Sequence, residues 1–144
     1  MKSENQSQYQ SQHPGALLTS FKNIALVGAS AKPERPSYQV MVYLLEHGFN
    51  VFPVNPRLAG QQILGQEVYA DLADIPHKIE VVDVFRVPAA CPEIAEKAVR
   101  CGASLLWLQL GVISAEAEEI ARAAGLNIVM DKCTKIEHAE YLLR

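Results

Sequence analysis

The sequence predicts a single α/β domain in which helices cover both faces of a doubly wound parallel sheet of five or six strands. Three observations support this fold class. Short apolar runs rich in Val, Ile and Leu recur along the chain and alternate only weakly with polar residues, which is typical of strands covered on both faces. Amphipathic segments separate the runs, and three of them end at a glycine just before the next run. Strands that alternate with helices imply right-handed crossovers within one sheet.

The expected elements follow a polar N-terminal tail. Residues 1–15 are rich in Gln, Ser and Asn and are predicted to be a flexible tail, and residues 16–144 form the domain, with a short helix near its start. Strands are expected at 23–27, 50–54, 79–85, 104–108 and 126–130, with a short sixth strand near 67–69. Helices are expected at 37–47, 88–100, 114–124 and 135–143, with Ser37 as the first N-cap and Gly48, Gly102 and Gly125 as helix ends. The predicted strand order is 3-2-1-4-5 or its six-stranded extension.

Composition argues against several classes of protein. The formal net charge is -3 and no run of Lys or Arg occurs, so neither a nucleic-acid partner nor a membrane partner is expected. No apolar stretch reaches the roughly 18–20 residues of a spanning helix, and the N-terminus lacks the apolar segment of a secretory signal. The three cysteines are widely spaced and form no CxxC pair, so we expect reduced thiols, no metal site and a cytoplasmic location.

The segment after the first predicted strand carries the strongest chemical signal. Ligands of parallel α/β sheets bind at the carboxyl ends of the strands, near the point where the strand order reverses. Here Gly28 allows a ligand to approach the backbone, Ser30 adds a hydroxyl, and Lys32 and Arg35 add positive charge. The combination predicts a phosphate-bearing ligand. The alternative is a tight turn with two solvated cations.

A dinucleotide cofactor fits the sequence less well. The dinucleotide fingerprint G-x-G-x-x-G requires three glycines, and this loop has only Gly28, with Ser30 in place of the second. NAD-binding proteins also place an acidic residue after the second strand, whereas here Val54 is followed by Asn55, Pro56 and Arg57. The pattern disfavours NAD and leaves NADP open.

Five short motifs occur in order along the chain and resemble one known family. They are VGAS at 27–30 with Arg35, Pro36 and Ser37 behind it, PVNP at 53–56, DVFR at 83–86, WLQLG at 107–111 and DKC at 131–133. From residue 21 to about 142 the chain therefore resembles the CoA-binding domain family. The Rossmann-like fold of that family is shared with the nucleotide-binding domain of the succinyl-CoA synthetase alpha subunit.

The resemblance implies coenzyme A as the ligand and assigns residues to its parts. The phosphates would lie against Gly28, Ala29, Ser30, Lys32 and Arg35, and the adenine and ribose against Val54, Asn55 and Pro56. The other side of the cleft would be lined by Phe85, Arg86 and Val87, and the pantetheine end by Gln109, Gly111, Lys132 and Cys133.

No catalytic residue is identified. Succinyl-CoA synthetase acts through a phosphohistidine on a separate domain, and none of His13, His47, His77 and His138 occupies a matching position. The expected function is non-catalytic binding of coenzyme A or an acyl-CoA by a carrier, sensor or regulator. The alternatives are an NADP-dependent reductase, a subunit of an acyl-CoA ligase that requires a partner chain, and a nucleotide-responsive regulator. The sequence leaves open whether the chain forms a homo-oligomer or has a protein partner.

Two further residues have both a functional and a structural interpretation. Cys133 follows a strand and precedes a helix, and we hypothesise that it forms a mixed disulfide with the thiol of CoA; the alternative is an inert packed cysteine. Asp83 interrupts an apolar strand and is interpreted either as a functional carboxylate or as a partner for buried polar groups.

Overall fold

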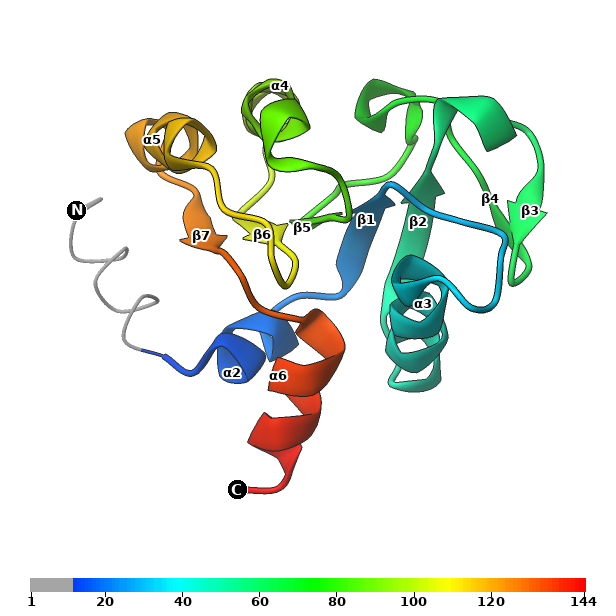
Figure 1. Ribbon diagram of the computed structural model, residues 1–144, viewed down its shortest axis with the longest axis horizontal. Helices are drawn as coiled ribbons and strands as arrows, with labels where there is room; N and C mark the ends of the chain where they lie inside the picture. Colours follow the sequence, from blue (N-terminus) through cyan, green and yellow to red (C-terminus); the bar gives the residue numbers. More distant parts are fainter. Residues whose placement is uncertain (1–11) are drawn as a thin grey trace.

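A computed structural model describes residues 12–144 and has the predicted α/β architecture, with one parallel sheet between two layers of helices (Figure 1). The sheet has five strands, β1 (Asn23–Val27), β2 (Asn50–Val54), β5 (Val81–Val84), β6 (Leu105–Leu108) and β7 (Asn127–Val129). All neighbouring pairs in it are parallel. The fold class predicted from the alternation of apolar runs is confirmed.

Two apolar clusters hold the helices against the sheet. Helices α4 (Cys91–Arg100) and α5 (Ala115–Ala123) pack on one face. Helices α2 (Pro14–Thr19), α3 (Pro36–Glu46) and α6 (Thr134–Leu142) lie on the other face, as Figure 1 shows. Every residue of β5 and β6 is buried, because helices cover both faces of these central strands. Burial on both faces therefore explains why apolar and polar residues alternate only weakly in the predicted strands.

The strand order corrects the sequence-based expectation. The observed order is β2-β1-β5-β6-β7, which is 2-1-3-4-5 for the five predicted strands, so the order 3-2-1-4-5 is wrong. After β2 the chain forms the turn η1 (Pro56–Leu58), a hairpin of β3 (Gln62–Ile63) and β4 (Gln66–Glu67), and the turn η2 (Leu72–Asp74). No α-helix lies between β2 and β5, and β5 pairs with β1 on the side away from β2. The short sixth strand predicted near 67–69 overlaps β4 at Glu67 and forms a single parallel bridge between Tyr69 and Val54, but it adds no sixth strand to the parallel sheet.

The helix starts also differ from expectation. Helix α3 begins at Pro36 with Arg35 as its N-cap, and Ser37 is a buried residue of the first turn rather than the cap. Proline is favoured at the first helical position because its missing N–H has no intrahelical partner there. The predicted helix at 88–100 divides into the turn η3 (Pro88–Ala90) and α4. Gly48, Gly102 and Gly125 follow α3, α4 and α5 with positive φ, as predicted.

The N-terminal helix starts before the predicted domain boundary. Helix α2 begins at Pro14, and the Nδ1 atom of His13 accepts a hydrogen bond from the backbone N–H of Gly15. Residues 13–15, which the sequence assigned to the tail, thus belong to this helix and its cap, while residues 1–11 lie outside the described part of the chain. Within residues 12–144 no helix combines the length and the apolar character needed to span a bilayer.

Candidate functional site

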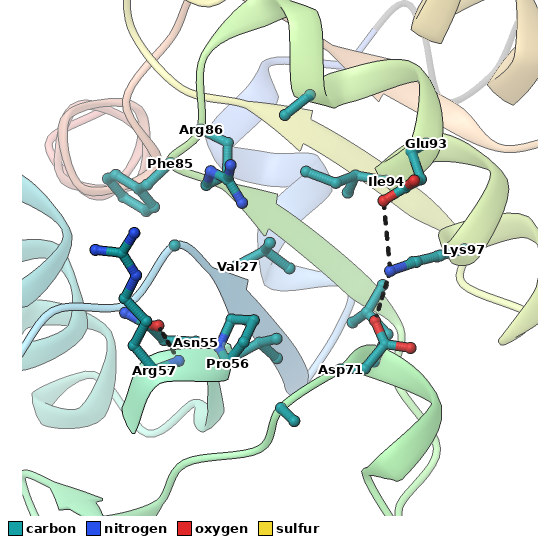
Figure 2. Close-up of a pocket in the computed structure, with 15 residues that line it drawn as sticks. Val27, Asn55, Pro56, Arg57, Asp71, Phe85, Arg86, Glu93, Ile94 and Lys97 are labelled. Atoms are coloured by element: carbon teal, nitrogen blue, oxygen red, sulfur yellow. Dashed lines mark hydrogen bonds and ion pairs between the residues drawn. The ribbon is translucent and has the colours of Figure 1, made fainter. Parts of the chain in front are cut away.

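A cleft of about 570 Å³ opens at the carboxyl ends of β1, β2 and β5. The chain runs from β1 to β2 on one side and later returns to β5 on the other, so the strand order reverses at this point. The cleft is lined by Val27, Gly28, Val54, Asn55, Pro56, Arg57, Ala70, Asp71, Leu72, Phe85, Arg86, Ala90, Glu93, Ile94 and Lys97 (Figure 2). It has the position that the strand-end rule predicts for a ligand site.

The loop after β1 is held in place by its own backbone and by Asn55. The N–H groups of Gly28 and Ala29 both donate to the carbonyl of Val54, and Asn55 Nδ2 donates to the carbonyl of Ala29 over 2.8 Å. Gly28 has a φ of +92°, and a Cβ atom added there would overlap the carbonyl of Phe85. The glycine is therefore required both by its backbone conformation and by the close approach of β5.

Beyond Gly28 the loop has free backbone donors. The Oγ atom of Ser30 accepts from the N–H of Lys32, and among the described residues the backbone N–H groups of Ser30 and Ala31 have no hydrogen-bond partner. The side chains of Lys32 and Arg35 are exposed and do not line the cleft. Free N–H groups near two cations are suited to an anion such as phosphate.

Two arginines enter the cleft from different loops. Arg57 lies in η1 after β2, where Asn55 Oδ1 accepts a 2.9 Å hydrogen bond from its backbone N–H, and Arg86 follows β5 (Figure 2). Neither guanidinium makes a hydrogen bond or ion pair with a described residue. A guanidinium presents several N–H donors in one plane and binds phosphate groups strongly. The cleft therefore presents two separate guanidinium groups of the kind that binds phosphate.

The far end of the cleft is closed by an ion pair. Lys97 Nζ lies 2.9 Å from Asp71 Oδ1 and 3.6 Å from Glu93 Oε1, which joins α4 to the segment before η2. The hydrogen bond from Lys97 lowers the pKa of Asp71, and the same contact raises the pKa of Lys97. Both side chains are partly exposed, so we interpret the pair as a wall of the cleft that contributes little stability.

A buried polar cluster lies beside the cleft, on the α6 side of the sheet. Asp83 on β5 is fully buried, and its Oδ1 accepts from Gln109 Nε2 at 2.5 Å while its Oδ2 accepts from Thr134 Oγ1 at 3.0 Å. Burial raises the pKa of Asp83 to about 7, against the lowering effect of these two hydrogen bonds. Asp83 thus has the buried structural role that the sequence left as one of two interpretations.

Comparison with known families matches residues 22–139 to the family described as CoA binding domain. The chain belongs to the CoA-binding domain family. It is 33% identical over 123 residues to the uncharacterized protein YneT of Bacillus subtilis, covering 85% of this chain and 90% of that protein. A hypothetical protein from Pyrococcus horikoshii superimposes with a TM-score of 0.85 and 44% identity, over 95% of this chain and 92% of that one.

Larger proteins contain a related segment. The chain is 30% identical to the alpha subunit of the ADP-forming acetate–CoA ligase I of Pyrococcus furiosus, over 75% of this chain but 26% of the ligase subunit. This chain therefore spans about a quarter of that relative's length. An acetyl-coenzyme A synthetase of Candidatus Korarchaeum cryptofilum superimposes with a TM-score of 0.67 at 23% identity, which shows the shared fold.

The structure brings six of the predicted site residues of this CoA-binding domain together in the cleft. These are Gly28, Val54, Asn55, Pro56, Phe85 and Arg86. The remaining residues of the first loop lie beside it: Ala29 is buried, and Ser30, Lys32 and Arg35 follow it towards α3. Val87 is 62% exposed and does not line the cleft.

The four residues predicted at the pantetheine end lie on other loops of the same sheet edge. Gln109 is buried in the Asp83 cluster, and the N–H of Gly111 donates to Asp131 Oδ1. Lys132 is exposed, and its carbonyl accepts from Trp107 Nε1. Cys133 is the half-buried N-cap of α6. None of the four lines the cleft itself.

Sequence reasoning did not include Asp71, Glu93 and Lys97 among the site residues, although the structure places them on the cleft wall. A search along strand ends cannot find them, because Glu93 and Lys97 lie within α4 and Asp71 lies before η2. The i,i+4 spacing of Glu93 and Lys97 is typical of any ion pair on a helix surface and does not by itself indicate a ligand site. Arg57 was noted after the second strand but was not assigned to the ligand.

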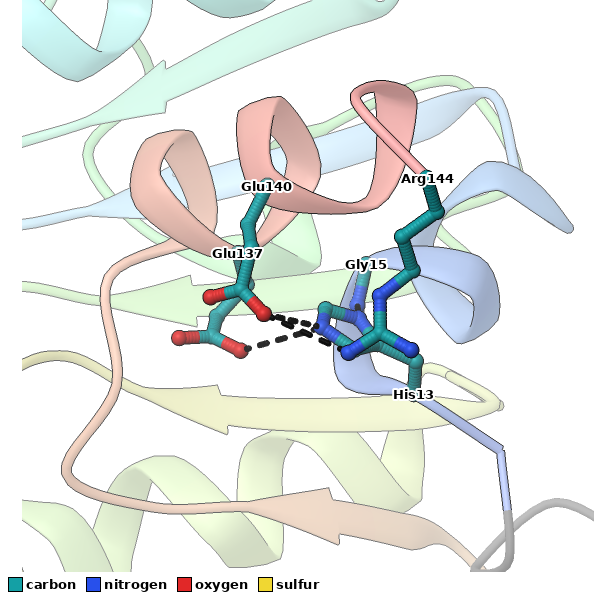
Figure 3. Close-up of polar contacts among 5 residues, drawn as sticks. All are labelled: His13, Gly15, Glu137, Glu140 and Arg144. Atoms are coloured by element: carbon teal, nitrogen blue, oxygen red, sulfur yellow. Dashed lines mark hydrogen bonds and ion pairs between the residues drawn. The ribbon is translucent and has the colours of Figure 1, made fainter.

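Among residues 12–144, one group of metal-ligand type occurs, and it lies far from the cleft, where α2 meets α6 (Figure 3). His13 Nε2 lies 3.2 Å from Glu140 Oε1 and 3.9 Å from Glu137 Oε1, and Arg144 also pairs with Glu140. Because Nδ1 of His13 accepts from the N–H of Gly15, its ring proton lies on Nε2, facing the carboxylates. We therefore interpret the group as a contact that fastens α2 to α6.

Proposed function

We propose that this chain binds coenzyme A or an acyl-CoA at the carboxyl edge of its sheet, as a carrier, sensor or regulator, and does not itself catalyse a reaction. The observation that supports this most directly is the cleft at the strand reversal, with two unpaired arginines and the tight loop at Gly28. Membership of the CoA-binding domain family supports the same ligand.

The proposed placement follows the charges of the cleft. The pyrophosphate lies against the free N–H groups of Ser30 and Ala31, and Arg57 and Arg86 hold phosphate oxygens from the two sides. Adenine and ribose occupy the apolar surface of Val54 and Pro56. The pantetheine arm continues along the sheet edge over β5 and β6.

The histidines support a non-catalytic role. His47 Nδ1 contacts the carbonyl of Tyr43, His77 stacks on Phe52, and His138 is buried with Nδ1 2.7 Å from the Tyr43 hydroxyl. His13 caps α2. Each of the four histidines is therefore engaged away from the cleft, and none lines it.

Isothermal titration with CoA, acetyl-CoA, NAD and NADP tests this proposal. We expect CoA or acetyl-CoA to bind at micromolar concentrations or tighter, with no heat from NAD or NADP. NADP is the important comparison, because Arg57 after β2 can also bind a 2′-phosphate. Binding of NADP without binding of CoA would replace the proposal with the reductase interpretation.

The arginines supply the matched variants. Arg86→Ala removes a charged phosphate donor and should weaken CoA binding by about 1.5–3 kcal/mol. Arg100→Ala is the control, because Arg100 is an exposed cation at the end of α4 outside this cleft. Equal effects of the two substitutions would indicate general electrostatic attraction rather than a phosphate contact in the cleft.

The ligase relative supports a second candidate function, that of a subunit which requires a partner chain. Acetate, ATP and CoA should then be converted only when a chain with ligase activity is added. If the rate of acetyl-CoA formation is the same with and without the added ligase chain, this second candidate function is excluded.

A further inference from the structure

The amide nitrogen of Gln109 is held by two hydrogen-bond acceptors. Its Nε2 donates both to Asp83 Oδ1 at 2.5 Å and to Thr134 Oγ1 at 3.0 Å, and the Thr134 hydroxyl in turn donates to Asp83 Oδ2. Above its pKa of about 7, Asp83 is ionised and only accepts hydrogen bonds, so the nitrogen of the amide then faces Asp83 and the oxygen faces away. The three residues come from β5, β6 and the first turn of α6, and their geometry is set by the sheet.

The amide oxygen of Gln109 is left without a partner but remains accessible. Among the described residues it makes no hydrogen bond. Asn127 Oδ1 is the only side-chain N or O atom of these residues that is both fully enclosed and without a hydrogen bond, so the Gln109 oxygen is not fully enclosed. Gln109 directly follows β6, so this access opens at the carboxyl edge of the sheet. Gln109 as a whole is 5% exposed, and its amide oxygen is thus an oriented acceptor at the edge.

We propose that Asp83 is a positioning residue, which holds the Gln109 amide so that its Oε1 accepts a hydrogen bond from an amide N–H of the pantetheine arm. This inference rests on the proposed binding of CoA. The cleft is bounded on the β2 side by Pro56, Arg57 and Ala70, so an arm that leaves the phosphate sites passes over β5 and β6. Pantetheine carries two amide N–H groups, whereas the proposed placement keeps the nucleotide half of CoA at the loops after β1 and β2.

The test compares CoA with adenosine 3′,5′-bisphosphate, which lacks pantetheine, by isothermal titration of the full chain. Gln109→Ala should weaken CoA binding by about fivefold, the loss of one hydrogen bond, and leave the bisphosphate unchanged. Asp83→Asn permits both amide orientations and should weaken CoA binding about two- to fivefold, again without effect on the bisphosphate. Gln62→Ala, at the exposed position of β3, is the control and should change the affinity for neither ligand.

The double variant distinguishes positioning from separate contacts. If Asp83 acts through Gln109, Asp83→Asn added to Gln109→Ala should cause no further loss of CoA affinity. Additive losses, or equal losses for both ligands, would overturn the inference.

If the wild-type chain binds the bisphosphate and CoA equally well, the inference fails while the proposed nucleotide site stands. If it binds neither ligand, the proposed function fails and this inference with it.

A pH profile of the wild-type chain provides a measurement that requires no substitution. A protonated Asp83 gains an O–H donor and no longer fixes the amide, so the affinity for CoA relative to the bisphosphate should fall as the pH is lowered below about 7. Asp83→Asn supplies the baseline, because the phosphate groups of the two ligands themselves titrate at about pH 6, and the fall should be present in the wild type beyond that baseline. Wild-type and Asp83→Asn profiles that coincide would contradict the inference.

The surroundings of Asp83 make this pH dependence specific. Its register partners are Leu26 on β1 and Trp107 on β6, which do not titrate. Helix α6 and its cap bring Cys133, Lys135 and His138, and α3 brings Tyr38 and Tyr43. Among the described residues none of these groups hydrogen-bonds to Asp83 or shifts its pKa.

Discussion

The α-carbon of Gly28 lies against the carbonyl oxygen of Phe85, so the loop after β1 and the end of β5 meet without room for a side chain between them. This contact forms the floor of the cleft at the point where the strand order reverses. It also explains why a single glycine suffices in this loop. The backbone needs one position with positive φ, and the same position needs the close approach.

Gly28→Ala should therefore be far more damaging than an alanine at a glycine in open space. Gly60 also has a positive φ, but nothing lies within 4 Å of an added Cβ there. Gly60→Ala should lower the free energy of unfolding by about 1 kcal/mol through backbone strain, and Gly28→Ala by more than about 2 kcal/mol through strain and overlap. Urea unfolding measures both values. Equal losses would show that the Phe85 contact is easily relieved.

Arg35→Ala tests the loop after β1 as a phosphate site. Arg35 is exposed at the N-cap of α3 and lies beside the cleft rather than in its lining. If it turns inward to hold a phosphate, its loss should cost about 1.5–3 kcal/mol of CoA binding, measured by titration. If the affinity for CoA is unchanged, Arg35 does not contact a phosphate, and the backbone N–H groups, Arg57 and Arg86 are the remaining phosphate donors.

Cys133 remains a candidate for a mixed disulfide with the thiol of CoA. It is half-buried at the N-cap of α6, on the edge along which the pantetheine arm is proposed to lie. With diamide as the oxidant, both thiols lose their protons, an S–S bond forms and diamide is reduced to the hydrazine. Mass spectrometry should show a CoA adduct on Cys133, and Cys91, which is buried in α4, serves as the internal control. An unmodified Cys133 would mean that its thiol is only a packing group.

Asp83 should make the stability of the chain depend on pH. Burial raises its pKa from 3.8 to about 7, so the folded chain holds a proton in this range that the unfolded chain has released. Its contribution to stability is complete below the unfolded pKa and is lost as the pH rises through 7. Between about pH 5 and pH 8 the unfolding free energy of the wild type should fall by roughly 2–3 kcal/mol relative to Asp83→Asn. Parallel urea titrations at several pH values measure the difference, and curves that run parallel would show that Asp83 is not held at a raised pKa.

Much of the fold could be predicted because its signals are local. The apolar runs at β1, β2 and β6 and the glycines after α3, α4 and α5 determine strands and helix ends through the residues themselves. The strand order could not be predicted in the same way. It depends on which edge of the sheet β5 joins, and β5 pairs with β1, a contact between residues that lie far apart in the sequence.

The sequence by itself determined the α/β class, the glycine loop at Gly28 and the expectation of a phosphate-bearing ligand, because each depends on residues close together in the chain. Only the tertiary structure decided how distant residues combine. It placed Lys97 of α4 on the cleft wall opposite Asp71, and it enclosed Gln109 between Asp83 and Thr134. The physical reason is that burial and hydrogen-bond partners are properties of packed elements. A polar residue at the end of a strand looks the same in the sequence whether its side chain faces a ligand or holds a neighbouring side chain in place.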